Sequence, residues 1–178
     1  MAVSISVYVG TSGYNYPEWR GTFYPEKFST TKMLAYYAER FPTVEVNNTF
    51  YRMPKESVLR DWAERVPDGF TFVLKASQRI THYARLKEES IESLGYLLGC
   101  ASVLGDRLGP ILFQLPPNLK KDLPRLTAFL EHLPAGTRAA FEFRNPSWLD
   151  GDVYDLLRAH DLALCIANTD EEETPFEA

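Results

Sequence analysis

The sequence lacks any apolar run of about 18 residues, so no segment of it is predicted to span a membrane. It has only two cysteines, Cys100 and Cys165, and neither stands in a C-x-x-C pair or at a metal-ligand spacing. Because both lie in apolar stretches, we expect buried free thiols in a reducing compartment, which favours a cytoplasmic protein. A glycine-rich dinucleotide loop is also absent, and this disfavours an open nucleotide-binding sheet.

Positive charge is in deficit, since 24 acidic residues stand against 19 basic ones and the formal net charge is -5. A general nucleic-acid binder is usually basic, so this balance argues against one. The hydrophobic share of 45% and the charged share of 24% are typical of a folded domain. The N-terminal segment MAVSISVYVG is too short and polar for a secretory signal, and we interpret it as a strand. We therefore expect one domain over residues 1–178.

Short apolar runs alternate with amphipathic helical segments along the chain. Val, Ile, Phe and Leu are dense in these runs, which predicts β-strands over 4–10, 43–47, 70–75, 110–115, 138–143 and 162–167. Between them, apolar residues recur at helical spacing, as in Leu94, Leu97 and Leu98, and Thr30 or Thr31, Asp122 and Asp150 are the expected N-caps. Such repetition predicts an α/β fold of parallel strands joined by right-handed crossovers.

Two architectures fit this alternation, an open doubly wound sheet and a closed TIM-type (β/α) barrel. Central strands of a doubly wound sheet are apolar on both faces, because helices cover both. Here one face is repeatedly polar. Strand 43–47 sets Val44 and Val46 against Glu45 and Asn47. Since successive side chains point to opposite faces, the apolar set would contact helices and the polar set would share an interior, which favours the barrel. The first strand is expected to turn Ile5, Val7 and Val9 towards the helices.

The predicted barrel is incomplete, because a full one has eight strands and we find six. A truncated chain, a naturally shortened barrel and an open assembly that needs a partner are the alternatives, and we favour truncation. An open barrel would expose its last strand to association with another molecule.

The connections that follow the strands are long, and they lie where barrel enzymes keep their active sites. They contain eleven Lys or Arg and four Glu but no Asp, in residues 11–28, 45–55, 75–87, 114–121 and 142–148. This edge is therefore expected to attract anions although the whole chain is acidic. The acidic tail 168–178 would leave the last strand on the same side. Aromatic residues are dense in these loops. Most are expected to pack loops onto the rim, while Tyr14 and Trp19 are candidates to stack on a ligand.

Six polar side chains are predicted to face the interior near the strand ends: Glu45, Asn47, Lys75, Gln114, Glu142 and Arg144. Glu45 and Glu142 are the candidate catalytic carboxylates, because burial and neighbouring cations can set their pKa values apart. The alternative is a structural network in which Glu45 pairs with Lys75 and Glu142 pairs with Arg144.

The remaining candidates are assigned by residue type. Lys75 suits an imine-forming nucleophile or, with more weight, a counter-ion, and Arg144 suits an anion clamp. Gln114 and Asn47 would orient a ligand. His82, close to Arg79 in a basic loop, is a candidate acid/base or phosphate contact. We predict no metal site, since no tight spacing joins the carboxylates and this histidine, and we predict no cofactor.

Five segments between Val9 and Trp148 form a recognisable pattern: GTSGYNYPEWRGTFYP, TVEVNNTFYRMP, FVLKASQRITHYARL, GPILFQLPP and AAFEFRNPSW. They closely resemble the YecE-like proteins, domain-of-unknown-function family 72. The resemblance implies a TIM-type barrel whose chain usually continues through two further strands. It also implies an Asp where Asn168 stands here. It implies a site at the strand ends but no established reaction.

Three functions follow from these expectations. The first is an enzyme with acid/base or hydrolytic chemistry on a small anionic or sugar-like ligand, in which Glu45 and Glu142 transfer protons. The second is a nucleic-acid-processing or binding protein that uses the basic loops and aromatic residues. The third is a non-catalytic binding or assembly module, which an open barrel would favour as an oligomer.

Overall fold

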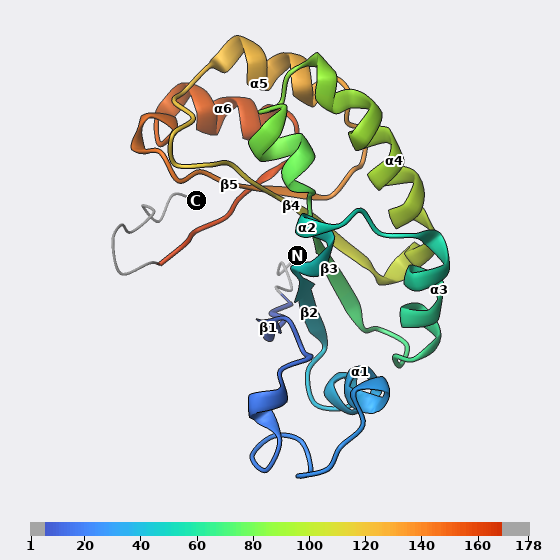
Figure 1. The fold of residues 1–178 in the computed structure, drawn as a ribbon. Helices are drawn as coiled ribbons and strands as arrows, with labels where there is room; N and C mark the ends of the chain where they lie inside the picture. The colour runs from blue at the N-terminus through green and yellow to red at the C-terminus, as the bar shows by residue number, and fades with distance from the viewer. Residues whose placement is uncertain (1–5, 169–178) are drawn as a thin grey trace, which may run out of the picture.

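The computed structural model describes residues 6–168. Its centre is a six-stranded parallel sheet whose strands are hydrogen-bonded in the order β1-β2-β3-β4-β5-β6 (Figure 1). The strands are β1 (Gly10–Ser12), β2 (Thr43–Val46), β3 (Thr71–Lys75), β4 (Leu108–Gln114), β5 (Ala139–Glu142) and β6 (Ala163–Leu164). The predicted α/β fold with parallel strands is therefore confirmed.

Helices connect the strands. The α-helices are α1 (Thr30–Ala38), α2 (Asn48–Tyr51), α3 (Glu56–Glu64), α4 (Ile91–Ala101), α5 (Leu123–Leu130) and α6 (Gly151–Ala159). Short helical turns are η1 (Pro17–Trp19), η2 (Arg79–Tyr83), η3 (Glu88–Ser90), η4 (Ser102–Arg107) and η5 (Pro146–Trp148). Within residues 6–168, no helix has the length and apolar character needed to cross a membrane.

The consecutive strand order decides where the helices lie. A doubly wound sheet reverses its order at a switch point and carries helices on both faces. Here the order never reverses, and the longer helices form an arc along one side of the sheet (Figure 1). The doubly wound alternative is therefore wrong. The sheet is not closed, since β1 and β6 are its two edges over the described residues, and the expected closed barrel is found only as an open, consecutively ordered sheet.

The main core lies between this sheet and its helices. Phe72 and Leu74 of β3 are fully buried, and Phe72 stacks on Trp62 of α3 with 6.0 Å between ring centroids. Phe113 of β4 contacts Phe129 of α5 at 5.5 Å. Because side chains alternate along a strand, the strand residues next to Phe72 and Phe113 point to the opposite face of the sheet. That opposite face carries the polar residues considered below.

The first strand differs from its prediction. It begins at Gly10, at the end of the expected range 4–10, and Val7 and Val9 are 80% and 62% exposed instead of covered by helices. Ile5 lies outside the described residues. Gly10 pairs with Thr43 of β2, and the two strands are very close here, because a Cβ on Gly10 would lie 2.2 Å from the Thr43 carbonyl oxygen. No other residue could approach β2 so closely at this point.

Helix starts are partly as expected. Asp122 and Asp150 cap α5 and α6 by accepting hydrogen bonds from the backbone N–H groups of Arg125 and Asp152, so both predicted N-caps are confirmed. The expected cap at Thr30 or Thr31 is wrong, since α1 begins at Thr30 and Ser29 occupies the cap without a side-chain bond. The acidic tail beyond residue 168 lies outside the described residues.

A bulge adjusts the register between β3 and β4. Phe72 pairs with Leu108 and Leu74 pairs with Ile111, so β4 has one extra residue over this interval. Gly109 and Pro110, expected to precede the strand or begin it, lie inside β4 at this point. A Cβ on Gly109 would lie 2.6 Å from Thr71 Cγ2 and 3.0 Å from the Phe72 carbonyl oxygen. Glycine is therefore required for the two strands to pair here.

We expect Gly109→Ala to lower the free energy of unfolding by roughly 1–3 kcal/mol, because the added methyl group overpacks the bulge. Gly99→Ala is the matched control. Gly99 is exposed on α4, and a Cβ added there would have no atom within 4 Å, so alanine should stabilise the helix by up to about 1 kcal/mol. Urea denaturation followed by circular dichroism measures both, and equal effects of the two substitutions would contradict the close approach.

Candidate functional site

Polar residues of neighbouring strands meet on the inward face because the strand register aligns them. Gln114 of β4 pairs with Glu142 of β5, and both are buried, at 7% and 6% exposure. The aromatic pair Phe113 and Phe141 stacks at 5.1 Å on the helix side, so Gln114 and Glu142 point inward. Lys75 at the end of β3 pairs with Leu112, two residues before Gln114, and belongs to the same face.

A hydrogen-bonded chain links β1 to β2 at the same edge. Ser12 Oγ donates to Glu45 Oε1 at 2.7 Å, and Asn47 Nδ2 donates to Ser12 Oγ. Ser12 has a single hydroxyl proton, which Glu45 accepts, so the Asn47 amide must turn its NH2 group towards Ser12. Asn47 Oδ1 is then left buried without a hydrogen-bond partner. Ser12 was missed by the sequence reasoning, because the expected strand ended at residue 10.

The two carboxylates have different partners. Glu142 Oε1 accepts a hydrogen bond from Arg144 Nε at 2.7 Å, with exposed side-chain fractions of 8% and 44%. The predicted pairing of Glu142 with Arg144 is thus present. The alternative pairing of Glu45 with Lys75 is wrong, because no ion pair within 4.0 Å joins them and Glu45 accepts from Ser12 instead. Lys75 Nζ lies 5.3 Å from the centroid of the Phe50 ring.

Cys165 joins this cluster from the other edge of the sheet. It follows β6, and its backbone N–H donates to the Phe141 carbonyl at 2.8 Å, which continues the β5–β6 pairing as far as Glu142. The pKa of the Cys165 thiol is raised to about 11, most strongly by burial and then by the charges of Glu142 and Glu45. Lys75 and Arg144 oppose this effect. The thiol is therefore protonated at neutral pH, and both carboxylates act on it, so residues of β2 and β5 converge.

The expectation for Cys165 was a buried free thiol in an apolar stretch. It is a free thiol, although only partly buried, whereas Cys100 is buried in the helical core. The strand alternation of Ala163 and Cys165 against Leu162 and Leu164 was the available signal that Cys165 shares the inward face.

His82 lies in the turn η2, beside the cluster. Its ring meets Phe50 edge-on at 5.0 Å, and Nδ1 lies 2.9 Å from Thr81 Oγ1. Burial lowers the pKa of His82, and the positive charges of Lys75, Arg144 and Arg85 lower it further, in that order. The imidazole is therefore neutral at pH 7. It can accept or donate a proton but contributes no charge to anion binding.

The other predicted ligand contacts lie apart from the cluster. Arg79 is exposed and lines a shallow surface pocket with Tyr83, Lys87 and Glu89. Ligand binding by Arg79 stays a prediction.

Tyr14 and Trp19 belong to an aromatic cluster that packs against the core, with Trp19 4.7 Å from Tyr16 and Tyr14 6.2 Å from Tyr37. Burial raises the pKa of Tyr14, and the charges acting on it are Arg65 and Asp61 of the α3 region, on the helix side. Both residues therefore pack a loop onto the rim, and their contact with a ligand stays a prediction.

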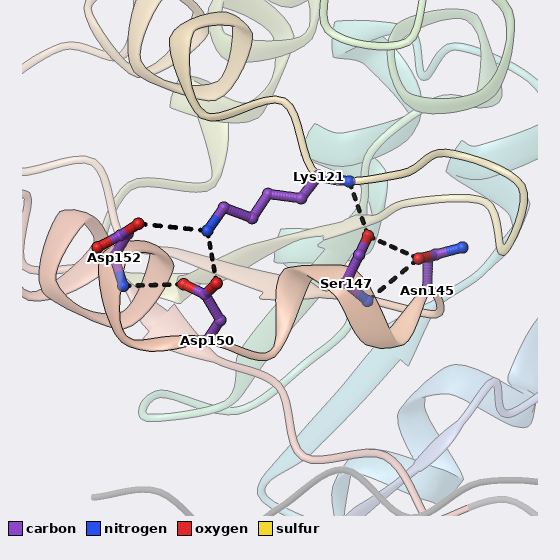
Figure 2. Close-up of polar contacts among 5 residues, drawn as sticks. All are labelled: Lys121, Asn145, Ser147, Asp150 and Asp152. Carbon is purple, nitrogen blue, oxygen red and sulfur yellow. Dashed lines mark hydrogen bonds and ion pairs between the residues drawn. The ribbon is translucent and has the colours of Figure 1, made fainter.

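Two loops at the rim of the site are fastened to each other. Figure 2 shows Lys121, from the β4–α5 loop, reaching Asp150 and Asp152 at the start of α6, with Nζ–oxygen distances of 2.5 and 3.3 Å. The backbone N–H of Lys121 donates to Ser147 Oγ at 2.8 Å, and Ser147 in turn donates to Asn145. This network holds the segment that follows Gln114 against the segment that follows Glu142.

Below this network, Trp148 is fully buried and its indole N–H donates to the Leu119 carbonyl at 2.7 Å. It stacks on Phe143 at 5.1 Å. Leu119, Phe143 and Trp148 belong to the main hydrophobic core, so both loops are anchored to it at the border of the inward cluster. Among residues 6–168, no group of three or more His, Cys, Asp and Glu side chains is arranged to hold a metal ion.

Fold and site together define an α/β protein with a consecutive parallel sheet and a mixed-charge polar cluster at the carboxyl ends of its strands. Residues 8–177 match the family model described as "Protein of unknown function DUF72". The chain belongs to this family, which confirms the resemblance stated for its sequence.

Curated relatives agree with this assignment. The chain is 32% identical over 143 residues to the UPF0759 protein YecE of Escherichia coli (strain K12), covering 80% of this chain and 50% of the relative. It is 29% identical over 157 residues to the UPF0759 protein YunF of Bacillus subtilis (strain 168), covering 84% of this chain and 54% of the relative. The chain thus spans about half the length of the curated relatives it matches.

Solved structures share the fold. A DUF72 family protein from Thermotoga maritima MSB8 superposes with a TM-score of 0.73 at 30% identity, over 88% of this chain and 63% of that one. A DUF72 family protein from Enterococcus faecalis V583 superposes with a TM-score of 0.72 at 19% identity, over 96% and 67% of the two chains. The second likeness shows the fold alone.

Replacing Lys75 with methionine should raise the pKa of His82, because Lys75 is the strongest of the charges that lower it. The pH titration of the His82 ring protons by NMR measures this, with His132 and His160 as internal references. Lys32→Met, on the exposed start of α1, is the control and should leave the titration unchanged. Because the pKa of His82 is lowered in the folded state, its neutral form stabilises the fold above about pH 6.5, and this contribution is lost as the pH falls.

Cys165 should react slowly with iodoacetamide at pH 8, because its pKa of about 11 leaves little thiolate. Of the two carboxylates that raise this pKa, Glu142 has the larger effect, so Glu142→Gln should lower the pKa and accelerate the reaction several-fold. The rate is measured in a Cys100→Ala background, and Glu131→Gln on the exposed end of α5 serves as the matched control. An unchanged rate in Glu142→Gln would show that Glu142 does not act on the thiol.

Proposed function

We propose that the carboxyl edge of the sheet binds a small anionic ligand, with Lys75 as its principal charge. The supporting observation is that Lys75 is absent from the ion pairs found within 4.0 Å among the described residues, although Glu45 and Glu142 lie on the same inward face. A partly buried ammonium group is stabilised by a negative partner. A ligand that carries a phosphate or carboxylate group would supply this partner, and Phe50 beneath Lys75 would limit its access to water.

We also propose that the site catalyses a reaction in which Glu45 is the proton-transfer group. Ser12 and Asn47 hold it in place through the hydrogen-bonded chain from β1, and it has no cation within ion-pair distance in the described part of the molecule. Glu142 is in contact with Arg144, which neutralises the pair and suits it to orient a ligand. His82, neutral at pH 7, is the second group able to exchange a proton. The reaction class is acid/base or hydrolytic chemistry.

We further propose that the open sheet is part of a TIM-type barrel. The consecutive strand order and the single helical layer support this, since both are requirements of a (β/α) barrel. Polar residues on the inward face fit a barrel interior near its catalytic edge. Closure would pair β1 and β6, the outer strands of the sheet over residues 6–168, with further strands and would bring more residues to the site.

Titration with inorganic phosphate tests the anion site. Calorimetry should detect binding that weakens as ionic strength rises, and Lys75→Met should raise Kd by about tenfold or more, since it removes a charge-assisted contact. Lys32→Met should bind like the wild type. Glu45→Gln should tighten binding a few-fold, because it removes a like charge from the site. Phosphate binding that is equal in wild type and Lys75→Met would refute this proposal.

A further inference from the structure

Two buried oxygen atoms of the site have no hydrogen-bond donor. They are Asn47 Oδ1 and Gln114 Oε1, and both belong to the inward face at the strand ends. A third buried unpartnered atom of the described residues, Arg107 Nε, lies at the opposite end of β4. Buried polar atoms are nearly always hydrogen-bonded in folded proteins, so an unpaired pair at one site calls for a partner.

The chemistry of these two atoms is that of acceptors. Asn47 cannot be turned over, because its NH2 group is committed to Ser12, whose only proton is committed to Glu45. Gln114 is 93% buried. Its neighbour Glu142 accepts a hydrogen bond from Arg144. Phe113 points to the opposite face, towards α5. What is missing at both positions is a donor, and a carboxylate or fully ionised phosphate group has none to give.

The cation of the site stands between the two acceptors. β2 ends at Val46, which pairs with Leu74, so Asn47 at the start of α2 and Lys75 follow directly on neighbouring strands. Thr49 of α2 fixes this turn by donating to the Lys75 carbonyl at 2.7 Å. On the other side, Lys75 pairs with Leu112, two residues before Gln114. Along the sheet, the sequence of groups is therefore acceptor, cation, acceptor. Such an order matches a ligand whose anionic group is accompanied by hydroxyl groups.

We propose that the ligand is a polyhydroxylated anion, a sugar acid or sugar phosphate, whose hydroxyl groups donate to Asn47 Oδ1 and Gln114 Oε1 while its anionic group contacts Lys75. This rests on the anion site proposed above and adds the chemistry of the ligand's carbon skeleton. Hydroxyl groups suit these positions because each one donates a proton and still accepts from a neighbouring group. A site with buried acceptors also rejects ligands that lack the matching donors, which makes Asn47 and Gln114 residues that determine specificity.

The test compares ligands that differ only in hydroxyl groups. Gluconate and hexanoate have the same carbon chain length and the same carboxylate, and ribose 5-phosphate and 2-deoxyribose 5-phosphate differ by one hydroxyl group. Calorimetry on the wild-type protein should give gluconate or ribose 5-phosphate at least tenfold tighter binding than its less hydroxylated counterpart. The pair that shows the difference identifies carboxylate or phosphate as the anionic group.

Gln114→Leu provides the second arm. It removes the acceptor without leaving a polar atom buried, so the midpoint of thermal unfolding should stay the same or rise, which shows that the variant folds. The affinity for the hydroxylated anion should fall about tenfold, while Kd for inorganic phosphate changes less than twofold. Gln78→Leu, at the chain's other glutamine before η2, is the matched control and should bind like the wild type.

The outcomes separate this inference from the anion site. If inorganic phosphate binds but hydroxyl groups add nothing in either pair, water satisfies the two acceptors and the inference is refuted, whereas the anion site stands. If the hydroxylated anion binds more tightly and Gln114→Leu removes the gain, the inference is supported. If neither phosphate nor any of the four compounds binds, both proposals are refuted.

Discussion

The site depends on one constraint, the strict alternation of side chains along six parallel strands held in a fixed register. A slip of one residue between β4 and β5 would turn Phe113 into the interior and Gln114 into the helices. Two glycines protect the register where strands approach too closely for a side chain, Gly10 against Thr43 and Gly109 against Phe72. Aromatic residues on the helix side and polar residues on the inward side are therefore two results of the same hydrogen-bond ladder.

The electrostatics of the inward face follow from an uneven pairing of charges. Glu142 and Arg144 form an ion pair, Glu45 is held by a hydroxyl group, and Lys75 rests near an aromatic ring. The effects on their neighbours have opposite signs. Burial and then the carboxylates raise the pKa of Cys165, while burial and then the cations lower the pKa of His82, so both titratable neighbours are neutral at pH 7. A neutral thiol and a neutral imidazole beside unpaired charges suit a site that binds an ion and moves a proton.

Much of the fold could be predicted from the sequence, because β-branched runs and helical periodicity are local signals. Strands 43–47 and 70–75 were within one residue of β2 and β3. The prediction of the first strand was wrong, because the alternation of Val7 and Val9 is typical of a buried strand, whereas both side chains are exposed. Ser12 was lost with it. The bulge at Gly109 was also missed, because it arises from contact with Thr71 in another strand and no local pattern records that contact.

The sequence by itself determined which residues share a face, since alternation is a property of the single strand, and it placed Glu45, Lys75, Gln114 and Glu142 together correctly. It also determined the family, DUF72, through segments spread along the chain. Only the tertiary structure decided which side chains are in contact. Glu45 is bound by Ser12 and not by Lys75, and Cys165 joins the cluster. The amide oxygens of Asn47 and Gln114 have no hydrogen-bond donor. The physical reason is that strand pairing brings together residues far apart in the chain, and partners are chosen by the distances that this pairing creates.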